Sequence, residues 1–93
     1  MQLDAFQQLM ADTYGARDQA RGVDATIAWL AEELGELARA VRKGTRAEQL
    51  HEIGDVLAWL ASLTGQLELS LDDAAARYAH GCPRCRALPC DCP

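Results

Sequence analysis

Apolar residues recur three or four positions apart along most of this chain, which is the spacing of one face of an α-helix. No segment alternates apolar and polar residues as a half-buried β-strand does. The first helical stretch begins at Leu3 and is expected to end near Gly15. The segment 15–24 is polar and contains two glycines, so it is predicted to be a loop.

Two longer helices are expected next, and both have recognisable ends. The second helix should start at Asp24 or Thr26 and stop at Gly44, because glycine is favoured just after the end of a helix. Thr45 and Glu48 have the spacing of a capping box, which predicts the start of a third helix. This third helix is expected to fade near Gly65.

Ser70 and Asp73 repeat the capping-box spacing and predict a short fourth helix, closed by Gly81. The expected fold is all-α, a small bundle of three to four helices. Residues 1–80 are assigned to this domain and residues 81–93 to a short Cys- and Pro-rich tail. Because a chain of 93 residues buries little apolar surface alone, we expect oligomerisation into a homodimer or homotetramer to complete the bundle.

Acidic residues gather in two clusters on the second and third predicted helices. Glu32, Glu33 and Glu36 form the first cluster, and Glu52 and Asp55 form the second. Acids three residues apart share one side of a helix, and an antiparallel pair of helices would bring the two clusters together. Carboxylates packed closely raise one another's pKa values unless a cation neutralises them. Such hard oxygen ligands favour Mg²⁺ or Mn²⁺.

Two features favour a binding site over a merely solvated acidic face. The acids are interleaved with apolar positions, where burial is costly unless the acids are paired or bind a cation. Each cluster also contains a glycine, Gly35 or Gly54, and a mid-helix glycine costs roughly 1 kcal/mol relative to alanine. The expected compensation is that the missing side chains let the two helices approach closely.

The pattern Glu32-Glu33-x-x-Glu36, a spacer of fifteen residues and Glu52-x-x-Asp55 resembles the signature of the MazG-type nucleotide pyrophosphohydrolases. This family belongs to the all-α NTP pyrophosphatase superfamily, and the resemblance covers the last three predicted helices. It implies hydrolysis of (d)NTPs to the nucleoside monophosphate and pyrophosphate, in nucleotide-pool house-cleaning. It further implies that four of these acids hold Mg²⁺ or Mn²⁺, namely Glu33, Glu36, Glu52 and Asp55. Glu32 would then be the catalytic base acting on water, or an outer-sphere partner.

The same resemblance suggests where a nucleotide would bind. Trp29 and Trp59 lie on the acid-bearing sides of their helices and are candidates for stacking on a base, with a core role as the alternative. Lys43 and Arg77 are candidates for phosphate contacts. The family's usual Lys- and Asn-containing segment is replaced here by "DDAAARYAHG", so a partner subunit is a possible source of further charge. His51 is expected to be a solvated helix residue.

All four cysteines lie in the last twelve residues, as Cys82-x-x-Cys85-x₄-Cys90-x-Cys92. Four thiolates satisfy a tetrahedral Zn²⁺ ion, but the inner gap of four residues is far shorter than in ordinary zinc modules. Three interpretations stay open at this point: a zinc knuckle, disulfides formed on oxidation, and a tail that orders only on binding.

Composition narrows the class of protein. The net charge of −5 argues against broad binding to a nucleic-acid polymer. The chain has no signal-peptide pattern and no apolar run long enough for a membrane span, so a cytoplasmic location is expected. The alternative to an enzyme is a non-catalytic nucleotide- or metal-binding regulatory module with a zinc-binding tail. A di-iron bundle is disfavoured because neither acid cluster contains the required Glu-x-x-His pair.

Overall fold

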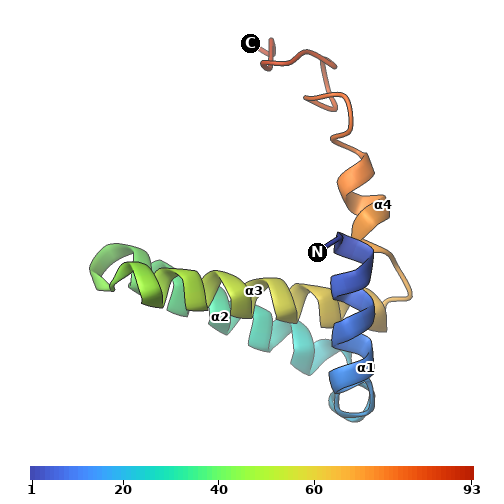
Figure 1. Cartoon of the computed structure of the whole chain (residues 1–93), viewed down its shortest axis with the longest axis vertical. Helices are drawn as coiled ribbons and strands as arrows, with labels where there is room; N and C mark the ends of the chain where they lie inside the picture. The colour runs from blue at the N-terminus through green and yellow to red at the C-terminus, as the bar shows by residue number, and fades with distance from the viewer.

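The computed structural model describes residues 1–93 and contains four α-helices and no β-strand, which confirms the expected all-α fold. α2 and α3 form a long antiparallel hairpin, and α1 crosses one end of it (Figure 1). α4 continues into the tail, which projects away from the hairpin (Figure 1). The helices are α1 (Leu3–Arg21), α2 (Val23–Lys43), α3 (Arg46–Gln66) and α4 (Leu71–Ala76).

The first helix is longer than its sequence pattern predicted. The prediction that the segment 15–24 forms a loop is wrong, because α1 continues as far as Arg21. The helix breaks only at Gly22, whose φ of +85° lies in the left-handed region that favours glycine. Polar residues can remain helical and buried here because they pair with one another: Asp18 is 5% exposed and accepts a 2.8 Å hydrogen bond from Arg21.

The turn between α2 and α3 follows the predicted signals. The Gly44 N–H donates to the Ala40 carbonyl at 2.8 Å, and a Cβ added to Gly44 would lie 2.8 Å from that same oxygen. A larger residue would therefore force the turn to shift. Thr45 and Glu48 form both hydrogen bonds of the predicted capping box, each 3.2 Å long. This turn fixes the antiparallel register of the two acid-bearing helices.

The fourth helix begins where it was expected, since the Ser70 hydroxyl accepts a hydrogen bond from the Asp73 N–H at 3.2 Å. Gln7 of α1 forms hydrogen bonds to this segment with both the nitrogen and the oxygen of its side-chain amide. Its nitrogen donates to the Leu69 carbonyl at 2.9 Å, and its oxygen accepts from the Leu71 N–H at 2.8 Å. The N-terminal part of α1 therefore holds the start of α4 in place.

The core is small, and its buried apolar residues are Leu30, Ala40, Ala61 and Leu71. Ala40 lies close to the turn of the hairpin, away from the end that α1 crosses (Figure 1). Equally many buried residues are polar, and Thr26 is fully buried. The Thr26 hydroxyl donates to the Gly22 carbonyl and accepts from the Gln66 amide, both at 2.8 Å. These bonds join the start of α2 to the end of α3 and satisfy polar groups that water cannot reach.

The opposite end of the hairpin, around Gly44, projects beyond α1 (Figure 1). Gly35 and Gly54 do not have the predicted packing role, because a Cβ added to either would meet no atom within 4 Å. Both glycines are exposed, so the approach of α2 to α3 within one chain does not depend on them. No helix combines the length and the apolarity that a membrane crossing requires.

Candidate active site

The α2–α3 hairpin brings the two acid clusters to face each other. Ligand atoms of His51, Glu52 and Asp55, all on α3, lie within 4.8 Å of one another. Glu33 faces them from α2. Burial, and then the charges of Asp55, Glu52 and the other two acids of its own cluster, raise the pKa of Glu33. The structure therefore places Glu33 among the acids of both helices.

Glu52 has an unsatisfied oxygen in the middle of this group. Its Oε2 is buried and has no hydrogen-bond partner. A buried carboxylate oxygen without a partner is costly, and a bound cation would remove that cost. Asp55 is better satisfied, because its Oδ2 lies 3.3 Å from His51 Nε2. The carboxylate donors and the orphaned oxygen together fit a divalent cation with a preference for oxygen ligands.

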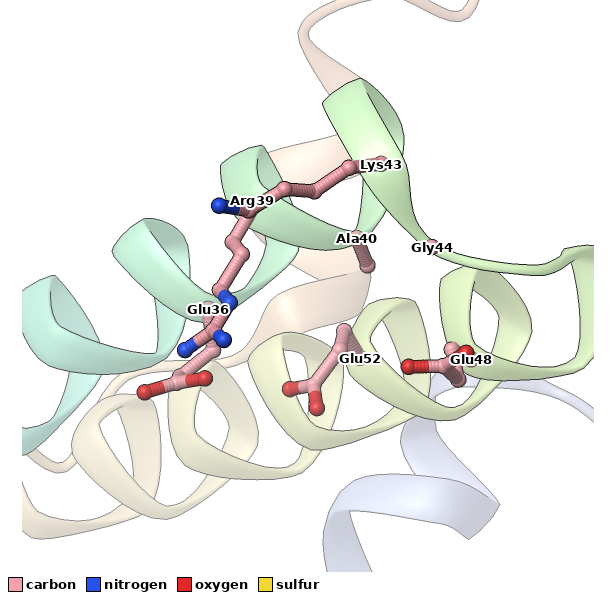
Figure 2. Close-up of a pocket in the computed structure, with 7 residues that line it drawn as sticks. All are labelled: Glu36, Arg39, Ala40, Lys43, Gly44, Glu48 and Glu52. Carbon is pink, nitrogen blue, oxygen red and sulfur yellow. The ribbon is translucent and has the colours of Figure 1, made fainter.

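Glu36 and Glu52 also line an open cavity of about 390 Å³ towards the turn of the hairpin. Figure 2 shows their carboxylates on the same side of the two helices, with Arg39 beside Glu36. The predicted phosphate contact Lys43 lines this cavity as well. The remaining lining residues are Ala40, Gly44 and Glu48. Acidic and basic side chains thus line the same cavity between the two helices.

Glu32 occupies the edge of the acid cluster. It is exposed on α2, as Glu36 is, whereas Glu33 is half-buried. The structure thus separates Glu32 from the more enclosed Glu33 and Glu52.

The two tryptophans lie together. Trp29 and Trp59 are stacked with ring centroids 5.8 Å apart and an angle of 13° between their planes. Trp29 remains 45% exposed, whereas Trp59 is partly covered and also contacts the Arg21 guanidinium, 4.7 Å from its ring centroid. The pair combines a structural contact between α2 and α3 with one indole that is exposed to solvent.

A second cavity, of about 290 Å³, lies between α1 and α3 and shares Asp55 with the acid cluster. Four of its lining residues come from α1: Tyr14, Arg17, Asp18 and Arg21. The sequence-based prediction assigned Arg17, Asp18 and Arg21 to a loop, and it did not propose Tyr14, at the end of the expected first helix, as a site residue. Their spacing of three, one and three residues is that of a single helical face, and it could have identified them. The remaining lining residues are Ala58, Trp59 and Ser62.

Residues 21–84 match the family model described as the MazG nucleotide pyrophosphohydrolase domain. The chain belongs to this family. It is also similar to Uncharacterized protein YpjD of Bacillus subtilis (strain 168), with 42% identity over 66 residues. That match covers 60% of this chain and 60% of the relative. No solved structure matches the chain. The predicted MazG resemblance is therefore confirmed.

The MazG match includes all five acids of the two clusters and both tryptophans. It begins at Arg21, so Tyr14, Arg17 and Asp18 lie outside it. Arg77 lies within the match, but its guanidinium is 5.5 Å from the Tyr78 ring and it lines neither of the two cavities. A single chain does not bring Arg77 to the acids.

The four cysteines of the tail also meet, and none of them forms a disulfide. Hydrogen bonds from the Cys85 and Arg84 backbone lower the pKa of the Cys82 thiol to about 6. Hydrogen bonds from the Asp91 and Ala87 backbone lower the pKa of Cys85. Interaction with Cys90 and the other thiols raises the pKa of Cys92 to about 11. Of these cysteines, only Cys82 lies within the MazG match.

Proposed function

We propose that this protein hydrolyses (d)NTPs to the nucleoside monophosphate and pyrophosphate, with Mg²⁺ or Mn²⁺ as its cofactor. Membership of the MazG family supports the class of reaction. The observation that carries the metal assignment is the buried, unpartnered Oε2 of Glu52. It lies among carboxylates whose mutual repulsion a divalent cation would relieve. We assign Glu33, Glu36, Glu52 and Asp55 as the ligands.

The acids divide into ligands and a base. When bound, the cation supplies charge to neutralise the phosphate oxygens and to lower the pKa of a water molecule. We assign Glu32 as the catalytic base that accepts a proton from the attacking water. Its exposure at the edge of the cluster leaves its carboxylate accessible to solvent. The neighbouring Glu33 is more enclosed, which suits a ligand better than a base.

The nucleotide is proposed to lie along the same wall of the hairpin. Lys43 and Arg39 line the cavity beside the acids and would bind phosphate oxygens. Trp29 would stack on the base with its exposed surface, while Trp59 supports it from the other side of the stack. Arg77 would contribute to the site only if a second subunit brings it there.

A homodimer or homotetramer is proposed because the hairpin exposes rows of apolar residues. Ile27, Leu34 and Val41 are 47%, 50% and 62% exposed, and their spacing of seven residues places them along one side of α2. Ile53 and Leu57, one turn apart on α3, are 52% and 37% exposed. A second copy that covers these rows would supply burial that a chain of this size lacks.

The proposed role is the removal of surplus or non-standard nucleotides, in the cytoplasm where these compounds are used. No nucleic-acid polymer or membrane is proposed as a partner. The net charge of −5 would repel a polyphosphate backbone, whereas a single triphosphate can be carried together with its cation.

The test is the release of pyrophosphate from a panel of standard, deoxy and modified NTPs with Mg²⁺ or Mn²⁺. Wild type should release pyrophosphate only with metal, and Glu36→Gln should lose this activity. Glu48→Gln is the matched control, because Glu48 lines the same cavity and a glutamine can still complete the capping box. Absence of release from every NTP would overturn the proposed reaction, and metal binding without turnover would favour the non-catalytic regulatory module.

The division of roles has its own test. Glu32→Gln should keep metal binding, measured by calorimetry, and lose turnover. Asp55→Asn should weaken both. Equal metal affinity in these two variants would contradict the assignment of Glu32 as the base and Asp55 as a ligand.

A further inference from the structure

The sulfur atoms of the tail have the spacing of ligands around one ion. All four Sγ atoms lie within 4.8 Å of one another. Cys82 Sγ is 3.7 Å from Cys92 Sγ, and Cys85 Sγ is 4.0 Å from Cys90 Sγ. Four sulfurs placed tetrahedrally about 2.3 Å from a zinc ion are about 3.8 Å apart, close to both distances. The short inner gap in the sequence therefore does not prevent the four thiols from meeting.

The backbone of the tail is folded so that it directs these sulfurs inward. The Arg86 N–H donates to the Cys82 carbonyl at 2.7 Å, and the Cys82 N–H donates to the Ala87 carbonyl at 3.1 Å. Arg86 has a φ of +60° within this tight loop, and Gly81 before it has a φ of +101°. A Cβ added to Gly81 would lie 2.7 Å from the Ala87 oxygen, so this fold of the loop requires glycine there.

Backbone N–H groups also surround the sulfurs. The Asp91 N–H donates to Cys85 Sγ at 3.3 Å, and the Cys92 N–H donates to Cys90 Sγ at 3.4 Å. Such bonds stabilise thiolates and orient them as metal ligands. Four thiolates around a divalent cation retain a net negative charge. Arg84 lies between Cys82 and Cys85, and Arg86 directly follows Cys85, so both arginines would offset this charge.

We propose that Cys82, Cys85, Cys90 and Cys92 bind one Zn²⁺ ion in a closed, structural site. Four thiolates fill all positions of a tetrahedral ion, so no position is left for water or substrate. His80 does not belong to the group of converging ligands. The site is separate from the proposed enzyme activity, because soft thiolates favour Zn²⁺ whereas the hard carboxylates of the hairpin favour Mg²⁺ or Mn²⁺.

The test is the zinc content of the full chain, purified under reducing conditions and reconstituted with Zn²⁺ alone. Native mass spectrometry and elemental analysis should find one zinc per chain in wild type and none in Cys85→Ser/Cys90→Ser. His80→Ala should keep its zinc. Replacement by Co²⁺ should give the absorption bands of tetrahedral sulfur coordination in wild type and His80→Ala.

Circular dichroism of the same samples checks that the helices of the double variant still form, so that loss of zinc can be assigned to the tail. Wild type without zinc, or with its cysteines paired as disulfides under reducing conditions, would overturn the proposal. So would a double variant that keeps its zinc. None of these readouts depends on NTP hydrolysis, so the zinc site and the proposed function can fail independently.

Discussion

The two proposed metal sites of this protein are built in opposite ways. The acids come from two helices whose clusters are separated by fifteen residues of sequence, and they meet because the hairpin is antiparallel. The four cysteines lie within eleven residues, and a single loop brings them together. The acid site is open along a cavity of about 390 Å³, whereas the thiols enclose their centre without help from the helices. An open site suits a substrate, and a closed site suits structural stabilisation.

Removing one ligand of the acid site is expected to have the largest effect, and it should change hydrolysis without changing the zinc content of the tail. Glu52→Gln should reduce pyrophosphate release on the order of 10²- to 10³-fold, because it removes the carboxylate that carries the unsatisfied oxygen. Zinc in the tail should stay at the wild-type level. Steady-state kinetics and elemental analysis on one preparation would check both. Loss of zinc along with activity would show that the two sites are coupled.

The second prediction concerns the exposed apolar rows of the hairpin, which are proposed to be buried by a second copy of the chain, in contrast to the tail. Ile53→Lys should convert the proposed oligomer into a smaller species, because it places a charge on the exposed apolar row of the hairpin. Leu88→Lys is the control, since Leu88 is 86% exposed but lies in the tail. Sedimentation or light scattering would measure both masses. An unchanged mass for Ile53→Lys would remove this row from the interface.

A smaller effect is expected at the tryptophan pair. Trp29→Ala should raise the KM for the nucleotide roughly tenfold, since stacking of a base on an aromatic ring contributes about 1–3 kcal/mol. Trp59→Ala should instead lower the melting temperature more than Trp29→Ala, because Trp59 contacts both Trp29 and Arg21. Kinetics and thermal melts together separate these roles. A KM unaffected by Trp29→Ala would indicate that the pair is purely structural.

The smallest predicted effect is on the stability of the metal-free protein. Burial and then the charges of neighbouring acids raise the pKa of Glu33, so the folded chain holds this proton to a higher pH than the unfolded chain does. Wild-type stability should therefore fall as the pH rises through that raised pKa, and Glu33→Gln should lack this loss. At neutral pH the variant should melt a few degrees higher without metal and gain less from Mg²⁺. A lower melting temperature for the metal-free variant would contradict the repulsion argument.

Local signals in the sequence are reliable guides to the hairpin. The Thr45–Glu48 capping box and the glycine at 44 predict the turn correctly, because caps depend on hydrogen bonds between residues only a few positions apart. Helical periodicity likewise groups the acids of each cluster on one side of their helix. The MazG match spans both clusters.

The errors concern properties that depend on distant parts of the chain. Polar residues such as Asp18 and Arg21 suggested a loop, yet they are helical because they pair with each other while α1 packs across the hairpin. Gly35 and Gly54 suggested a close helix contact, yet space for a side chain is present at both. Neither outcome can be derived from local propensity, because each depends on which surface another helix covers.

The order of residues alone is enough to define the helical class, the turn that pairs α2 with α3, the side of each helix on which the acids lie, and the MazG resemblance. Packing of the whole chain decides which groups come together and which stay apart. It buries the unpartnered oxygen of Glu52, brings α1 residues beside Asp55 and gathers four sulfurs within 4.8 Å of one another. It leaves Arg77 apart from both cavities. This division follows from the range of the interactions. Helix periodicity and capping act over a few residues, whereas burial and the convergence of charges depend on how whole segments pack.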